Sequence, residues 1–188
     1  MTSRTVVVLP GGQNGPTAPL PMFASDAAEQ RGARVHPVWW DEPDRPFTLT
    51  EDERGHWVVS QAAKAVAAAT GDVLLIGKSL GSYGSALAAE RGFPAIWLTP
   101  VLTSPWVVDG LRRSTAPFLL VGGTADALWD SALARELTPY VLEVPEADHG
   151  MYVPGRLAAS ADVLGQVATA VEDFLDQVVW SPGPAARS

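Results

Sequence analysis

The chain has 188 residues, of which 47% are hydrophobic and 18% charged, and this composition predicts one globular domain with a sizeable core. Its formal net charge of −8 disfavours nucleic acids and anionic membranes as partners, because both attract positively charged surfaces. The absence of cysteine excludes disulfides, thiolate zinc sites and a cysteine nucleophile.

The N-terminal stretch MTSRTVVVLPGG contains an apolar run that ends at Pro10, which is shorter than the apolar core of a secretion signal. No other apolar stretch approaches the length of a membrane span. We therefore expect a soluble, cytoplasmic protein.

Short apolar runs alternate with helical patterns from one end of the chain to the other. The expected strands are residues 5–10, 33–40, 72–77, 94–100, 116–123 and 140–145. Expected helices cover 22–32, 50–70 (opened by a Thr50–Glu53 capping box) and 80–92. A last helix carries an apolar stripe at three-to-four spacing, formed by Val163, Leu164, Val167, Val171, Phe174, Leu175 and Val178.

This alternation predicts an α/β fold, with a doubly wound, mostly parallel sheet of about six strands and helices on both faces. We expect residues 1–180 to form this single domain and residues 181–188, SPGPAARS, to be a disordered tail. In such sheets the functional residues follow the carboxyl ends of the strands.

Residues 73–84, VLLIGKSLGSYG, match two motifs. A phosphate-binding P-loop requires a glycine five positions before Gly77, where Asp72 stands, and an open loop where this chain has an apolar strand. The G-x-S-x-G pattern of a nucleophile elbow fits better, because an apolar strand enters a tight turn flanked by Gly77 and Gly81 and a helix follows. We therefore predict that Ser79 is a nucleophile. Lys78 points either to the far side of the turn or into the cleft, where it would favour an acidic substrate.

A serine is a weak nucleophile without a base, and the base needs an acid to orient it. Asp126 lies a few residues past the strand expected at 116–123, and His149 lies in the loop after the strand expected at 140–145. The order of serine, aspartate and histidine along the chain, and their positions after strands, agree with the elbow motif.

The sequence resembles the α/β-hydrolase family along essentially its whole length, from VVVLPGG through GKSLG, GGTAD and ADHG to the last helix. Its layout is similar to that of small esterases and dienelactone-hydrolase-like members. The resemblance implies that Ser79 is the nucleophile, His149 the general base and acid, and Asp126 its orienter, with no metal or organic cofactor. Family members with a helical cap insert it between the fourth and fifth strands, where this connection is short, so we expect no large cap.

Other residues compete for these roles. Asp130 could replace Asp126 but falls within the following helix, Asp148 adjoins His149 and would point away from it, and Asp109 follows the fourth strand, where some family members keep their acid. His36 in a strand and His56 in a helix are expected to be structural or surface residues.

The oxyanion hole is expected to use two backbone N–H groups. One belongs to Leu80, directly after the nucleophile. By resemblance the other comes from the loop LPGGQNG after the first strand, where the N–H of Gln13 is the expected donor and that of Gly12 the alternative. Gly11 stands where many family members carry a histidine.

Several aromatic residues and one methionine end or follow expected strands, and we expect them to line an apolar pocket above Ser79: Trp39, Trp40, Trp106, Trp129, Met151 and Tyr152. The alternative is that about half of them cover the core. Arg112 and Arg113 are expected to form a solvated helix end, or otherwise to contact an acidic group of the substrate.

These features predict a serine hydrolase that cleaves an ester-type acyl bond of a small, apolar or aromatic molecule through an acyl-enzyme intermediate. Two alternatives remain open. One is a biosynthetic thioesterase, lactone hydrolase, acyltransferase or cyclase that uses the same triad, and the other is a non-catalytic binding protein with this fold. The sequence leaves the oligomeric state open.

Overall fold

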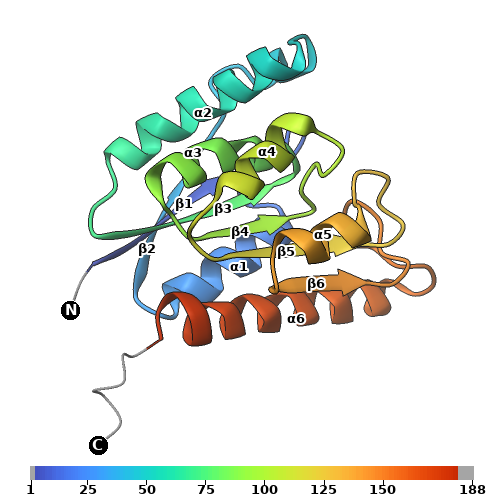
Figure 1. The fold of residues 1–188 in the computed structure, drawn as a ribbon. Helices are drawn as coiled ribbons and strands as arrows, with labels where there is room; N and C mark the ends of the chain where they lie inside the picture. The colour runs from blue at the N-terminus through green and yellow to red at the C-terminus, as the bar shows by residue number, and fades with distance from the viewer. Residues whose placement is uncertain (1–2, 182–188) are drawn as a thin grey trace, which may run out of the picture.

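The computed structural model describes residues 3–181, which form an entirely parallel six-stranded sheet covered by helices on both faces (Figure 1). The strand order is β2-β1-β3-β4-β5-β6. In chain order, the strands are β1 (Arg4–Leu9), β2 (Ala33–Pro37), β3 (Asp72–Lys78), β4 (Ala95–Leu98), β5 (Phe118–Gly123) and β6 (Val141–Val144).

Helices α1 (Pro19–Glu29) and α6 (Leu157–Phe174) lie side by side on one face of the sheet, and α6 continues as a π-helical turn, η3 (Leu175–Val179). The opposite face is covered by α2 (Glu51–Ala67), α3 (Ser85–Arg91), α4 (Pro105–Arg113) and α5 (Ser131–Leu137). Two short 3₁₀ segments complete the described elements, η1 (Arg45–Phe47) and η2 (Ser79–Gly84).

The central strands are apolar at nearly every position because both of their faces are buried. In β1, Val6 and Val8 pack toward α1 and α6, whereas Val7 and Leu9 pack toward α2 and α3. Strand β3 alternates in the same way. The α/β fold class with helices on both faces is therefore confirmed, and the connection between β4 and β5 contains only α4 in place of a large cap.

The start of α2 is confirmed in detail. The Thr50 hydroxyl accepts a hydrogen bond from the N–H of Glu53, and the Glu53 carboxylate accepts one from the N–H of Thr50. Hydrogen bonds from Thr50 hold the pKa of Glu53 below its usual value. This reciprocal pair satisfies two backbone donors that the first turn of a helix leaves unpaired.

Three boundaries differ from the predictions. Helix α1 begins at Pro19 rather than at residue 22, because prolines are well suited to the first turn of a helix. Strand β2 ends at Pro37 and leaves Trp39 and Trp40 in the following loop. The segment after Ser79 begins as the 3₁₀ turn η2, in which the Ser82 hydroxyl donates to the carbonyl of Ser79.

The predicted tail falls almost entirely on residues 182–188, which lie outside the described residues. Between residues 3 and 181, the helices are all too short or too polar to cross a membrane.

The chain leaves β1 in one direction across the sheet, toward β2, and leaves β3 in the other direction, toward β4. The carboxyl ends of β1 and β3 therefore lie at the point where the strand order reverses, which is the usual ligand site of open parallel sheets. The loop after β1 and the turn at Ser79 both begin there.

Candidate active site

Ser79 occupies a tight turn between β3 and η2. Its φ is +50°, in the left-handed region that residues other than glycine rarely adopt. A Cβ on Gly81 would overlap the carbonyl oxygen of Leu9, and a Cβ on Gly77 would overlap the ring of Trp97. The expectation that the turn requires glycine two positions before and after Ser79 is thus confirmed.

A chain of hydrogen bonds runs from Ser79 through His149 to Asp126. The Oγ of Ser79 lies 2.8 Å from Nε2 of His149, and Nδ1 of His149 lies 2.7 Å from Oδ2 of Asp126. An ionised carboxylate only accepts hydrogen bonds, so Nδ1 donates to Asp126 and Nε2 is left to accept the Ser79 proton. The three residues come from the carboxyl ends of β3, β6 and β5.

Asp126 and His149 differ in how far their side chains are exposed to solvent. The Asp126 side chain is buried, and its Oδ1 accepts a hydrogen bond from the N–H of Leu128 at 2.9 Å. The His149 side chain is one-third exposed. The carboxylate is therefore fixed inside the protein, whereas the imidazole can reach a ligand or water.

The loops that carry Asp126 and His149 are joined to each other. The N–H of Ala125 donates to the carbonyl of Ala147 at 3.0 Å, and the N–H of Glu146 donates to the Thr124 hydroxyl at 2.8 Å. Glu146, like Met151 two residues past His149, has a positive φ, so the His149 loop is bent sharply on both sides. These contacts fix the separation of the two side chains.

The competing residues lie elsewhere. Asp109 is exposed and forms an ion pair with Arg113 on α4. Asp130 is the N-cap of α5 and accepts from the N–H groups of Ala132 and Leu133, so it lies just before the helix rather than within it. Asp148 accepts from the N–H groups of Gly150 and Tyr152, within its own loop.

The remaining candidates are also accounted for. His36 lies in β2 and His56 in α2, where its ring packs edge-on against Trp106. Arg112 pairs with Glu136 on the surface, so this arginine, like Arg113, belongs to an exposed helix end. In the described part of the chain, no cluster of three or more His, Asp or Glu side chains could hold a metal ion.

The loop after β1 passes beside the elbow. The Cδ of Lys78 and the Cβ of Ser79 lie 3.2 and 3.8 Å from the position that a Cβ on Gly11 would occupy. Within residues 3–181, no protein acceptor bonds the N–H groups of Gly12 or Gln13. Leu80 stands in the first turn of η2, where backbone N–H groups have no partner inside the helix. Within the described residues, the three expected oxyanion donors therefore have no protein acceptor.

Solved structures similar to this one share the arrangement of strands and helices. Est1E from Butyrivibrio proteoclasticus, with ferulic acid bound, aligns with a TM-score of 0.69 and 14% identity over 96% of this chain and 91% of its own. Dienelactone hydrolase from Anabaena variabilis aligns with a TM-score of 0.68 and 18% identity, over 93% of this chain and 86% of its own. For a serine hydrolase without a lid from Xanthomonas campestris, the TM-score is 0.57 and the identity 17%, over 97% of this chain and 85% of its own. The chain has the α/β-hydrolase fold.

Sequence comparison adds nothing to this assignment. A scan against protein-family models and a search of curated proteins each found no match. The α/β-hydrolase fold is therefore established by the architecture, and the chemistry must be argued from the site.

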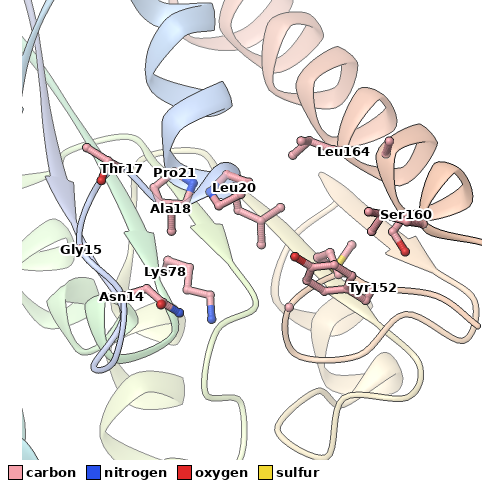
Figure 2. Close-up of a pocket in the computed structure, with 15 residues that line it drawn as sticks. Asn14, Gly15, Thr17, Ala18, Leu20, Pro21, Lys78, Tyr152, Ser160 and Leu164 are labelled. Carbon is pink, nitrogen blue, oxygen red and sulfur yellow. The ribbon is translucent and has the colours of Figure 1, made fainter.

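The six residues predicted to line the pocket have three different outcomes. Met151 and Tyr152 line a cavity of about 580 Å³ beside the elbow (Figure 2). Trp39 is exposed and lies against Gly15 in the loop after β1.

The other three tryptophans require a correction, because they pack against the scaffold. Trp40 stacks on Trp57 and donates from Nε1 to the carbonyl of Gly11, which holds the loop after β1. Trp106 fits against Gly55 on α2 and donates to the carbonyl of Tyr83. Trp129 is buried and donates to Glu143. Their position at strand ends predicted the correct edge of the sheet. It did not predict whether each ring faces the pocket or packs against the protein.

Two features of this site were not predicted. Phe47 is 59% exposed, and its ring lies against Gly12, with Leu80 also near. The cavity is walled largely by α1 and α6, including Leu20, Ser160 and Leu164 (Figure 2). The only sequence signal for Phe47 was an aromatic residue in a proline-rich loop, and no signal distinguished the cavity residues from ordinary core positions.

Proposed function

We propose that this protein is a serine hydrolase that cleaves ester-type acyl bonds through an acyl-enzyme intermediate. The observation that carries the proposal is the continuous hydrogen-bond chain from Ser79 through His149 to Asp126, at the carboxyl edge of the sheet. It supplies a nucleophile, a base within hydrogen-bonding reach of it, and an acid that orients the base.

The first half of the reaction follows from this geometry. The Oγ of Ser79 attacks the carbonyl carbon of the ester while Nε2 of His149 takes its proton. Asp126 stabilises the resulting imidazolium through Nδ1–H. The N–H of Leu80 and an N–H of the loop after β1, which we assign to Gln13 with Gly12 as the alternative, stabilise the oxyanion. His149 then protonates the departing alcohol and leaves an acyl group on Ser79.

The second half reverses these roles. Water enters through the exposed side of His149, which removes a proton from it as it attacks the acyl carbon. The same N–H groups stabilise the second oxyanion. Collapse of this intermediate returns the proton to Ser79 and releases the carboxylic acid. The dienelactone hydrolase with the same fold is named for a cyclic ester, which accords with this bond class.

A fluorophosphonate probe tests the proposal directly. We expect it to add one phosphonyl group to the folded protein, because the activated Ser79 attacks phosphorus as it would a carbonyl, and peptide mapping should place the adduct on Ser79. Short-chain p-nitrophenyl esters should be hydrolysed by the same preparation. A folded protein that acquires no adduct and turns over no ester in a series of acyl lengths would favour a non-catalytic binding role instead.

Replacing the proposed acid should separate it from its rivals. We expect Asp126→Asn to lower kcat by about 10³- to 10⁴-fold, because the amide favours the wrong tautomer of His149 and cannot stabilise the imidazolium. The matched control is Asp109→Asn, an exposed residue on α4, which should leave kcat within about twofold. The reverse pattern in steady-state kinetics would transfer the role of the acid to Asp109.

A further inference from the structure

Lys78 reaches the side of the sheet opposite to the nucleophile's helix. It is the last residue of β3, in which Leu74 and Ile76 pack toward α1 and α6. Because side chains alternate along a strand, Lys78 belongs to the same face. Its stem runs beneath Gly11, and the side chain lines the cavity between α1 and α6 (Figure 2). Lys78 therefore lines a cavity on this face of the sheet.

The ammonium group of Lys78 has no carboxylate partner in the described part of the chain. No carboxylate oxygen of residues 3–181 lies within 4.0 Å of its Nζ, whereas the only other lysine, Lys64, pairs with Asp41 at 3.0 Å. Burial lowers the pKa of Lys78, and the more distant charges of Asp126 and Asp148 oppose this shift. A half-buried cation without a partner is unfavourable in itself, and an anionic ligand would stabilise it.

The cavity has the size and walls of a small-molecule site. Its volume of about 580 Å³ lies within the range of 300–1,000 Å³ that is usual for such sites. Leu20, Met151, Leu157 and Leu164 give it apolar walls. Among the described residues that line it, Lys78 is the only charged one. An acidic group that entered this cavity would therefore meet one cation and no carboxylate in the walls.

Three residues that line the cavity are sequence neighbours of residues in the proposed catalytic site. Lys78 precedes the nucleophile, Gly150 follows the base, and Asn14 follows the expected oxyanion donor Gln13. Consecutive Cα atoms are only 3.8 Å apart, so the cavity wall begins beside the residues that we propose hold the reacting carbonyl group. In the view of Figure 2, Lys78 and Asn14 lie together on one side of the opening, and Tyr152 and Ser160 lie across from them.

We propose that this cavity receives the acyl chain of the substrate and that Lys78 binds a carboxylate at the far end of that chain. The substrate class is then a monoester of a dicarboxylic acid, whose methylene groups contact the apolar walls while its free acid pairs with the ammonium group. This inference rests on the proposed function, because it assumes that the acyl carbon is held at Ser79.

Matched pairs of esters test the inference. Monoethyl succinate, adipate and suberate are compared with ethyl butyrate, hexanoate and octanoate, which have the same acyl lengths without the free acid. The readout is the ratio of kcat/KM for the acidic ester to that for the neutral ester. We expect Lys78→Met to lower this ratio by about 10- to 100-fold at the best chain length, as is usual for loss of a charged hydrogen bond.

Two further variants make the result specific to the cation. Lys78→Arg should keep most of the preference because it keeps the charge, and Lys64→Met should leave the ratio unchanged because Lys64 lies on the surface of α2. Lys78→Gln replaces Lys78→Met if the latter fails to fold, as judged by thermal melting. A ratio that is the same in the wild-type protein and in Lys78→Met at all three chain lengths would overturn the inference.

A binding measurement separates this inference from the proposed function. Calorimetry with monoethyl adipate on Ser79→Ala should give a Kd at least tenfold lower than on the Ser79→Ala/Lys78→Met double variant. If the wild-type protein hydrolyses no ester but this difference is found, the carboxylate site at Lys78 stands and the catalytic proposal fails. If esters are hydrolysed but binding is absent or independent of Lys78, the cavity assignment fails alone.

Discussion

Ser79→Ala and His149→Ala are each expected to lower kcat for a p-nitrophenyl ester by about 10⁴- to 10⁶-fold while the protein stays folded. The first change removes the attacking oxygen, and the second removes the group that lies 2.8 Å from it and takes its proton. Since serine, histidine and aspartate act as a unit, the double variant should be hardly worse than either single variant. Steady-state kinetics and circular dichroism provide the two measurements.

Matched controls exist for both residues. Ser60 lies on α2 and His36 on β2, outside the site, so Ser60→Ala and His36→Ala should retain kcat within about threefold. The fluorophosphonate adduct should disappear in Ser79→Ala and persist in Ser60→Ala. If Ser79→Ala kept turnover above a tenth of the wild-type value, another group would have to be the nucleophile and the assignment of the elbow would be wrong.

The three residues of the hydrogen-bond chain could be found from the sequence because each is tied to a strand end. Buried parallel strands read as short apolar runs, and their carboxyl ends must meet at one edge. Ser79, Asp126 and His149 follow three such runs. The sequence did not need to specify the loops in detail, because the strand pairing brings these positions together over 70 residues of chain.

The pocket could not be found in the same way, since the direction of a loop side chain depends on packing that is not periodic. Trp40 and Trp106 lie where pocket residues were expected. Their indole N–H groups donate hydrogen bonds to the carbonyls of Gly11 and Tyr83, so their rings pack against the protein rather than line the cavity. Lys78 is an intermediate case. The alternation of β3 places it on the face of Leu74 and Ile76, but only the positions of α1 and α6 reveal that a cavity lies there.

Gly81→Ala is expected to lower the free energy of unfolding by about 3 kcal/mol, near the upper end of the usual effect of overpacking. The added Cβ would overlap the carbonyl oxygen and Cβ of Leu9, on the buried strand β1. Neither backbone can move without disturbing the pairing of β1 with β3, in which Leu9 stands opposite Gly77. Because the same turn carries Ser79, kcat should fall as well. Urea unfolding followed by fluorescence gives the stability.

Gly165→Ala is the matched control, because Gly165 lies within α6 and a Cβ there would meet nothing within 4 Å. The same glycine-to-alanine change at this exposed helical position should raise the free energy of unfolding by about 0.5–1 kcal/mol, since alanine restricts the unfolded chain and favours the helix. The two substitutions should thus have opposite signs. Equal stability of Gly81→Ala and the wild-type protein would contradict this prediction and mean that the elbow has room for a side chain at position 81.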